Sequence, residues 1–198
     1  MIDEELKQEG AESSKSPDKP EVKPAVAAPV AEKPKKAAPP PDPRVEAAKA
    51  IAEQIKEAIT ASLGDEAVEE VGAAHIRPMV RIGREKWQDA VELLRTHQDW
   101  KLNYIECMAG TDYPDYIEVV IYVQSTELDH FVCLKTRTPR ENAEIPSLVS
   151  SYPGVNWEER EIYDLLGVHF TNHPDLRRIM MWDDYQGHPL RKDFSEWE

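Results

Sequence analysis

Residues 101–137 read KLNYIECMAGTDYPDYIEVVIYVQSTELDHFVCLKTR, and this stretch predicts the sheet of the fold. Three runs within it are rich in β-branched and aromatic residues: Lys101 to Ala109, Tyr116 to Gln124 and His130 to Arg137. The segments between them, GTDYPD and STELD, carry turn-forming residues. Because connections this short join antiparallel neighbours, we expect these three runs to form an antiparallel meander.

The middle run predicts a sheet with two unlike faces. Side chains alternate along a strand, so one face receives Ile117, Val119, Ile121 and Val123, and the other receives Tyr116, Glu118, Val120 and Tyr122. The first set is purely apolar and the second is mixed. We therefore expect one face of the sheet to lie against a core and the other to be more polar.

Two amphipathic helices are predicted before this sheet. Asp42 is placed to cap a helix that has Pro43 in its first position, and apolar residues recur at helical spacing until Gly64. A second helix is expected from about Arg84 to Thr96, and its apolar face is formed by Trp87, Ala90, Val91 and Leu94.

The segment Ile76 to Ile82 lies between these helices and alternates loosely. It carries Pro78, which has no N–H to donate to a neighbouring strand, so we expect an edge strand or a strand that begins with a bulge. The element order predicts an α+β two-layer domain, with helices on one face of a largely antiparallel sheet.

A short helix is predicted after the sheet, from Asn156 to Gly167. Asn156 and Glu159 have the spacing of a capping box, and Gly167 is placed to end the helix. Arg160 stands four residues before Asp164, which permits an ion pair on one helix face.

The chain divides into three parts. Residues 1–43 hold 9 of the 16 prolines and no aromatic residue, so we expect this tail to be disordered. Residues 44–167 form the expected α+β domain. Residues 168–198 are dense in charged and aromatic side chains without a strand or helix period, which predicts an extended docking arm. Its expected anchors, on a surface of the same domain or of another chain, are Trp182, Tyr185, Phe194 and Trp197.

The composition excludes several classes of partner. The 198 residues include 24 Lys+Arg against 38 Asp+Glu, for a formal net charge of −14, so nucleic acid and anionic membranes are not expected. We find no apolar run near the ~20 residues of a membrane span and no apolar signal-peptide core, so we expect the chain to stay in the cytoplasm. Cys107 and Cys133 form no CxxC pair, and we expect both to be small buried apolar residues rather than ligands of an iron–sulfur cluster.

Few residues have the spacing of a catalytic or metal site. His169 and His173 are four apart, as two metal ligands on one helix face would be, but Gly167 and Pro174 argue against a regular helix through both. Glu159 and Glu161 are two apart on the predicted helix and do not face one another. The residues alone favour an interaction subunit, with a metal-dependent hydrolase as the alternative.

Two motifs are specific enough to indicate a family. Residues 159–180, EREIYDLLGVHFTNHPDLRRIM, resemble the signature of the 30 kDa subunit family of respiratory complex I, the C-subunit of NADH-quinone oxidoreductase. Residues 187–194, GHPLRKDF, resemble the closing segment of the same family. The resemblance covers about residues 70–196. The chain departs from the family pattern at Glu158, where an aromatic residue is expected, and at Leu166 and Ser195.

The resemblance implies a core subunit of the peripheral arm of the proton-translocating NADH:quinone oxidoreductase, which passes electrons from NADH through FMN and iron–sulfur clusters to a quinone. In the family this subunit carries no cofactor itself, and it packs on the large quinone-site subunit of 49 kDa beside iron–sulfur subunits. The implied location is the cytoplasmic face of the inner (plasma) membrane, without a membrane span. The equivalent subunit of a ferredoxin- or deazaflavin-dependent dehydrogenase, or of a membrane-bound hydrogenase, stays open, because this chain does not bind the electron donor.

The resemblance also implies roles in docking and local ordering, and no catalytic or metal-binding role, for a set of motif residues. The set is Glu159, Arg160, Glu161, Asp164, His173, Arg177, Arg178, Trp182, His188, Arg191, Lys192, Asp193 and Phe194.

Overall fold

The structure is a computed structural model that describes residues 42–195. Nearly all of the tail that the sequence predicts as disordered, and the predicted anchor Trp197, lie outside the described residues. The elements in chain order are α1 (Pro43–Leu63), η1 (Asp65–Ala67), β1 (Val68–Ala74), β2 (Arg77–Ile82), η2 (Arg84–Lys86), α2 (Trp87–Thr96), β3 (Tyr104–Asp112), β4 (Tyr116–Gln124), β5 (Phe131–Pro139), β6 (Glu144–Pro146), η3 (Pro153–Val155), α3 (Asn156–Leu166) and β7 (His169–Thr171).

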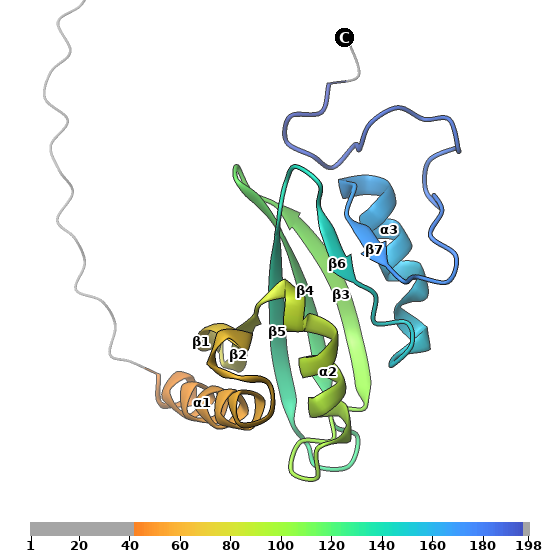
Figure 1. Cartoon of the computed structure of the whole chain (residues 1–198). Helices are drawn as coiled ribbons and strands as arrows, with labels where there is room; N and C mark the ends of the chain where they lie inside the picture. Colours follow the sequence, from red (N-terminus) through yellow and green to blue (C-terminus); the bar gives the residue numbers. More distant parts are fainter. Residues whose placement is uncertain (1–41, 196–198) are drawn as a thin grey trace, which may run out of the picture. The chain divides into compact units, whose positions relative to one another are not determined.

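A five-stranded sheet with the strand order β1-β2-β5-β4-β3 forms the centre of the fold (Figure 1). The predicted meander is confirmed, since β3 pairs with β4 and β4 with β5, both antiparallel. β2 pairs with β5 in parallel, and β6 and β7 form a separate parallel pair. The expected α+β class with a largely antiparallel sheet is therefore confirmed.

The first strand of the meander is displaced from its predicted bounds. β3 begins at Tyr104 because Lys101 has a φ of 44°, which is incompatible with a strand. It then continues through Gly110 to Asp112, so the turn before β4 is shorter than predicted.

The edge position predicted for the segment Ile76 to Ile82 is wrong. Its strand β2 lies between β1 and β5. Pro78 is tolerated because pairing with β5 begins only at Met79, and Pro78 itself lies opposite Ala73 of β1. The strand β1 was not predicted, because Val68–Ala74 has no alternation of apolar and polar residues.

The core lies on one face of the sheet, where the helices pack. The four apolar residues predicted for the buried face of β4, Ile117, Val119, Ile121 and Val123, have no exposed surface. The helices contribute to the same cluster Ile55 and Ile59 from α1, Trp87 and Leu94 from α2, and Ile162 and Leu166 from α3. On the opposite face, Glu118 accepts hydrogen bonds from Lys135 and Arg137, both at 2.8 Å.

The predicted ends of the helices are only partly confirmed. Asp42 accepts from the Arg44 N–H at 2.9 Å and caps α1, and Gly167 ends α3 with a φ of 74°. The cap predicted at Asn156 is wrong. The turn η3 runs directly into α3, so Asn156 already has helical φ and ψ of −49° and −47°, whereas a cap residue needs extended backbone.

Gly110 allows α3 to pack closely on β3. A Cβ at this position would lie 2.5 Å from Leu166 Cδ1 and 3.2 Å from Ile162 Cγ2. Both of these side chains are buried in the core. The absence of a side chain at Gly110 therefore sets the distance between the helix and the strand.

We expect Gly110→Val to push α3 away from β3 and to lower the free energy of unfolding by about 1–3 kcal/mol, as overpacking does in other cores. Chemical denaturation followed by circular dichroism measures this change. Gly154→Val is the matched control, since no heavy atom lies within 4 Å of a Cβ there. A Gly110→Val protein as stable as the wild type would contradict the close packing.

Candidate functional site

The predicted arm begins later than residue 168, because His169–Thr171 form the strand β7. The arm as the structure describes it is residues 172–195, which cap the end of α3 and follow β7 as the dark blue trace in Figure 1. An α-helix leaves its last four carbonyls without partners inside the helix. The last three carbonyls of α3 contact groups of the arm. The Asp164 carbonyl lies 2.9 Å from His188 Nδ1. The Leu165 carbonyl accepts from the Leu190 N–H at 3.0 Å, and the Leu166 carbonyl accepts from Arg191 Nε at 2.6 Å. We refer to these bonds, with those of the Asp164 side chain, as the α3–arm contact.

The Asp164 carboxylate is the centre of the α3–arm contact and has no exposed surface. Its Oδ2 accepts from three successive backbone N–H groups, those of Ile179, Met180 and Met181, at 3.0, 2.7 and 2.9 Å. Its Oδ1 accepts from Arg178 at 2.6 Å. Burial by itself would raise the pKa of Asp164, but the backbone donors and Arg178 together hold the pKa below its ordinary value. The carboxylate is therefore ionised at neutral pH.

Arg178 extends this contact to a second stretch of the arm. Besides pairing with Asp164, it donates to the carbonyls of Tyr185 and Gly187, both at 3.0 Å. The planar guanidinium can serve a carboxylate and two carbonyls at once, which a lysine ammonium does less well. Arg178 thus fixes the backbone after Trp182, whereas Asp164 holds the backbone before it.

The ion pair that helical spacing permits between Arg160 and Asp164 is replaced by the pair between Asp164 and Arg178. Arg160 Nε donates instead to the Arg177 carbonyl at 3.1 Å, and its guanidinium lies 5.1 Å from the Trp157 ring. The prediction failed because the arm supplies Asp164 with backbone donors as well as a charge, which a single neighbour on the helix cannot do.

A second anchor holds the far end of the arm against the sheet. Asp112, the last residue of β3, is buried and accepts from the Lys192 N–H at 2.8 Å. Arg140 Nε lies 2.8 Å from Asp112 Oδ1, and Arg140 also donates to Asp193 at 2.8 Å. Arg140 was not predicted as a site residue, because it follows β5 in an irregular segment without a recognisable motif.

Glu159 is a second acid of α3 that has no exposed surface. Ser147 Oγ and the Leu148 N–H donate to its two oxygens, each at 2.6 Å, and His173 Nε2 lies 3.9 Å away. The capping role predicted for Glu159 is therefore wrong, since its carboxylate ties α3 to the segment after β6 and lies beside the arm. Burial raises the pKa of Glu159 to about 7.

The two histidines with metal-ligand spacing lie in different surroundings. His169 is exposed on β7, whereas the His173 side chain has no exposed surface and lies 3.3 Å from the carbonyl of Asn156. Within residues 42–195, no group of three or more His, Cys, Asp or Glu side chains is placed to hold a metal. The geometry of the described residues gives the hydrolase alternative no support.

The cysteines differ from one another. Cys133 is buried, as predicted, but Cys107 is exposed, so that prediction is wrong for Cys107. Burial raises the pKa of both thiols, that of Cys133 to about 11. Both are therefore mainly protonated and weakly nucleophilic at neutral pH.

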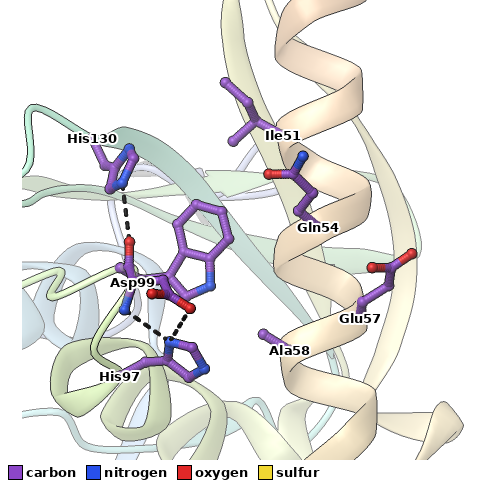
Figure 2. A pocket seen from close by; sticks show the side chains of 8 residues that line it. Ile51, Gln54, Glu57, Ala58, His97, Asp99 and His130 are labelled. Atoms are coloured by element: carbon purple, nitrogen blue, oxygen red, sulfur yellow. Dashed lines mark hydrogen bonds and ion pairs between the residues drawn. The ribbon is translucent and has the colours of Figure 1, made fainter.

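A cavity of about 480 Å³ lies between α1 and the turns that precede β3 and β5 (Figure 2). Figure 2 shows Gln54 and Glu57 on its α1 wall, opposite His97, Asp99 and His130. The Asp99 backbone engages both histidines: its N–H donates to His97 Nδ1 at 3.2 Å, and its carbonyl lies 3.0 Å from His130 Nε2. These contacts account for the orientation of the two imidazoles without a ligand.

The arm presents a group of apolar side chains to solvent. Met180 and Trp182 are each 62% exposed, and Leu190 is 59% exposed. The Trp182 ring contacts Tyr185 with centroids 4.7 Å apart, and Tyr185 contacts Phe194 at 6.1 Å. Large exposed apolar side chains held on a fixed backbone are typical of a protein interface.

The structure separates the predicted interface residues into two sets. Those engaged inside the chain by hydrogen bonds or ion pairs are Glu159, Arg160, Asp164, His173, Arg177, Arg178, His188, Arg191, Lys192 and Asp193. The others, which are exposed or half-buried in the aromatic contacts, are Glu161, Trp182 and Phe194. Contact of either set with a partner chain stays a prediction. Met180 and Leu190 were missed, because an isolated apolar residue in an irregular segment carries no periodic signal.

We expect Asp164→Asn to release the arm from α3. The amide has the shape of the carboxylate but no charge, and its NH2 group would face the backbone N–H groups or Arg178, which are themselves donors. The free energy of unfolding should fall by about 3 kcal/mol. Hydrogen exchange measured by mass spectrometry should become faster at the amides of Ile179, Met180 and Met181, and by a larger factor there than in β4.

The matched control is Asp175→Asn, which removes an exposed acid of the arm that pairs with Arg177 at 2.9 Å. A surface pair of this kind contributes little, so exchange in the arm should stay near that of the wild type. Equal exchange in the Asp164 and Asp175 variants would contradict the central role of Asp164.

The raised pKa of Glu159 predicts a pH-dependent stability. Folding raises this pKa from an ordinary 4.5 to about 7, so between these values the folded chain keeps a proton that the unfolded chain loses. The free energy of unfolding therefore falls as the pH rises through this window. Glu159→Gln, which cannot titrate, should reduce the fall between about pH 5 and pH 8 by on the order of 1–3 kcal/mol.

Denaturant titrations at several pH values test this, with Glu161→Gln as the control because Glu161 is exposed on the same helix. The control should follow the wild-type pH profile. A Glu159→Gln profile parallel to that of the wild type would show that Glu159 does not hold the proton.

Comparisons with known proteins identify the family of this chain. Residues 80–197 match the family described as respiratory-chain NADH dehydrogenase, 30 Kd subunit. The C-subunit of NADH-quinone oxidoreductase from Chlorobium phaeobacteroides is 36% identical over 155 residues, which cover 73% of this chain and 93% of that protein. The C-subunit of F(420)H(2) dehydrogenase from Methanosarcina mazei is 37% identical over 134 residues, which cover 66% of this chain and 84% of that protein.

Among solved structures, a chain of the membrane-bound sulfane sulfur reductase, an archaeal respiratory membrane complex, has the same fold. The TM-score is 0.57 at 23% identity, covering 73% of this chain and 85% of that chain. In the described part of our chain, no helix has both the length and the apolar character needed to cross a membrane. The family match includes α3, the whole described arm and the Asp112 anchor. The chain therefore belongs to the family of the 30 kDa subunit of respiratory-chain NADH dehydrogenase.

Proposed function

We propose that this chain is a core subunit of the peripheral arm of a proton-translocating NADH:quinone oxidoreductase. Its role is structural: it docks on the large quinone-site subunit and lies beside the iron–sulfur subunits. FMN and the iron–sulfur clusters belong to those partner chains, which carry electrons from NADH to the quinone. The complex places the chain at the cytoplasmic face of the membrane without a span of its own.

The observation that carries this proposal is the α3–arm contact within the region that matches the family. A stretch without regular secondary structure is held by buried, charge-assisted hydrogen bonds, while Met180, Trp182 and Leu190 stay exposed. Fixing the backbone before docking lowers the entropy lost on binding. This arrangement suits a surface that is ready for a partner subunit.

The second candidate is the equivalent subunit of a dehydrogenase with another electron donor. The similarity to a subunit of F(420)H(2) dehydrogenase, at 37% identity, favours it specifically. The two candidates share the docking role and differ in the neighbouring subunits. The composition of the purified complex therefore distinguishes them.

The test is an affinity purification of the tagged full chain from gently solubilised native membranes, with mass spectrometry of partners and an NADH:quinone assay. Recovery of flavin, iron–sulfur and membrane subunits with NADH activity supports the first candidate. The same set without an NADH-oxidising subunit supports the second. A tagged chain recovered without partners would contradict both.

Alanine in place of Trp182 or Leu190 should reduce co-purification of the large quinone-site subunit at least several-fold, because exposed anchors dominate binding energy. The denaturation midpoint of the free chain should stay unchanged. Leu128→Ala is the control, since Leu128 is 39% exposed in the turn between β4 and β5. An equal yield from all three variants would exclude the arm as the docking surface.

A further inference from the structure

A second surface, separate from the exposed side chains of the arm, lies at the free edge of the sheet. A groove of about 480 Å³ opens there between the start of β3 and the turn that leads into α3. Its lining residues are Asn103, Tyr104, Ile105, Glu106, Ser151, Tyr152, Pro153, Gly154, Val155 and Glu158. The groove is thus built along a strand on one side and a short turn on the other.

The strand at this groove has an outer edge available for pairing. β3 is the terminal strand of the five-stranded sheet. Farther along it, the Met108 N–H is bonded to Glu158 Oε1 at 3.2 Å, so α3 covers the edge from that point. Before Met108, at Tyr104 to Glu106, the outer edge of β3 faces the groove. An unpaired strand edge is a template for an additional extended segment.

The groove is negatively charged without compensation from its own walls. Glu106 and Glu158 line it, and no lysine or arginine does. Two bases on neighbouring segments are already engaged: Arg95 pairs with Glu92 at 2.7 Å, and Arg160 donates to a carbonyl of the arm. Burial, and then the nearby charge of Glu161, raise the pKa of Glu158. A positive side chain in the groove would relieve this unfavourable field.

The rim of the groove is aromatic and open. Tyr104, which lines the groove, is 50% exposed. A Cβ added at Gly154 would have no heavy atom within 4 Å, so a second chain has room on that side. Aromatic residues beside acids favour lysine or arginine through ion pairing and cation–π contact.

We propose that the groove receives a short extended segment of a partner protein, which pairs its backbone with β3 at residues 104–106 and places a Lys or Arg side chain between Glu106 and Glu158. This interface is additional to the docking of the arm and does not depend on the electron donor of the complex. The backbone pairing gives affinity, and the acidic pair selects a basic residue.

The first test uses the full chain and two synthetic probes, the peptides Ac-TKVKVKVT-amide and Ac-TEVEVEVT-amide. The basic peptide should bind, the acidic one should not, and amides 104–106 should exchange more slowly when the basic peptide is present. Glu106→Gln with Glu158→Gln should weaken binding at least about tenfold. Gln at position 158 can still accept from the Met108 N–H, so the fold is retained.

The control is Glu53→Gln with Glu57→Gln, which changes the net charge equally at two exposed acids of α1. This control variant should bind the basic peptide as tightly as the wild type does. Equal weakening in both double variants would mean attraction by overall charge and would overturn the proposal. Absence of binding, or binding without protection of amides 104–106, would overturn it as well.

The second test places a photo-crosslinking benzoylphenylalanine at position 104 in the assembled complex, with position 128 as the control. The proposal expects the adduct at position 104 to map to an extended segment that carries Lys or Arg. An adduct with a helix or an acidic segment, or no adduct in a complex that is fully assembled, would overturn it. Assembly of the complex is measured separately from the adduct at position 104. A missing adduct in an assembled complex therefore contradicts only the groove proposal, whereas a loss of assembly concerns the docking role of the arm.

Discussion

The C-terminal part of the described structure depends on the hydrogen bonds that the buried Asp164 carboxylate accepts. This carboxylate receives three backbone N–H groups and a guanidinium while having no exposed surface. Desolvation of a charge without such partners costs several kcal/mol, so the burial of Asp164 depends on these donors. The arm has no periodic apolar face that could fix it by burial alone. Its order instead comes from charge-assisted hydrogen bonds to α3 and, at its far end, to Asp112.

Three acids give α3 three different attachments. Glu158 bonds the edge of β3, Glu159 bonds the segment after β6, and Asp164 bonds the arm. Their environments set their protonation differently: burial raises the pKa of Glu158 and Glu159, whereas backbone donors and Arg178 lower that of Asp164. The helix is thus a connector whose polar side chains face three separate parts of the fold.

This arrangement is consistent with a subunit whose task is to hold surfaces in place. The exposed apolar residues of the arm and the acidic groove at β3 differ in chemistry, so they suit different partners or different segments of one partner. Among the described residues, hydrogen bonds within the chain engage His97, Glu159 and His173. Membership in the family of the 30 kDa subunit of respiratory-chain NADH dehydrogenase fits such a role.

Local patterns were enough to predict the meander, α1 with its Asp42 cap, α2, and the end of α3 at Gly167, because alternation, helical spacing and caps act over a few residues. The two long motifs were also enough to indicate the family. Long-range packing, in contrast, sets the neighbours of β2, the burial of Glu159 and the pairing of Asp164 with Arg178. These contacts join residues that are distant in sequence, such as Met79 with Cys133 or Asp112 with Lys192, and no local pattern encodes which distant donor reaches a given acid.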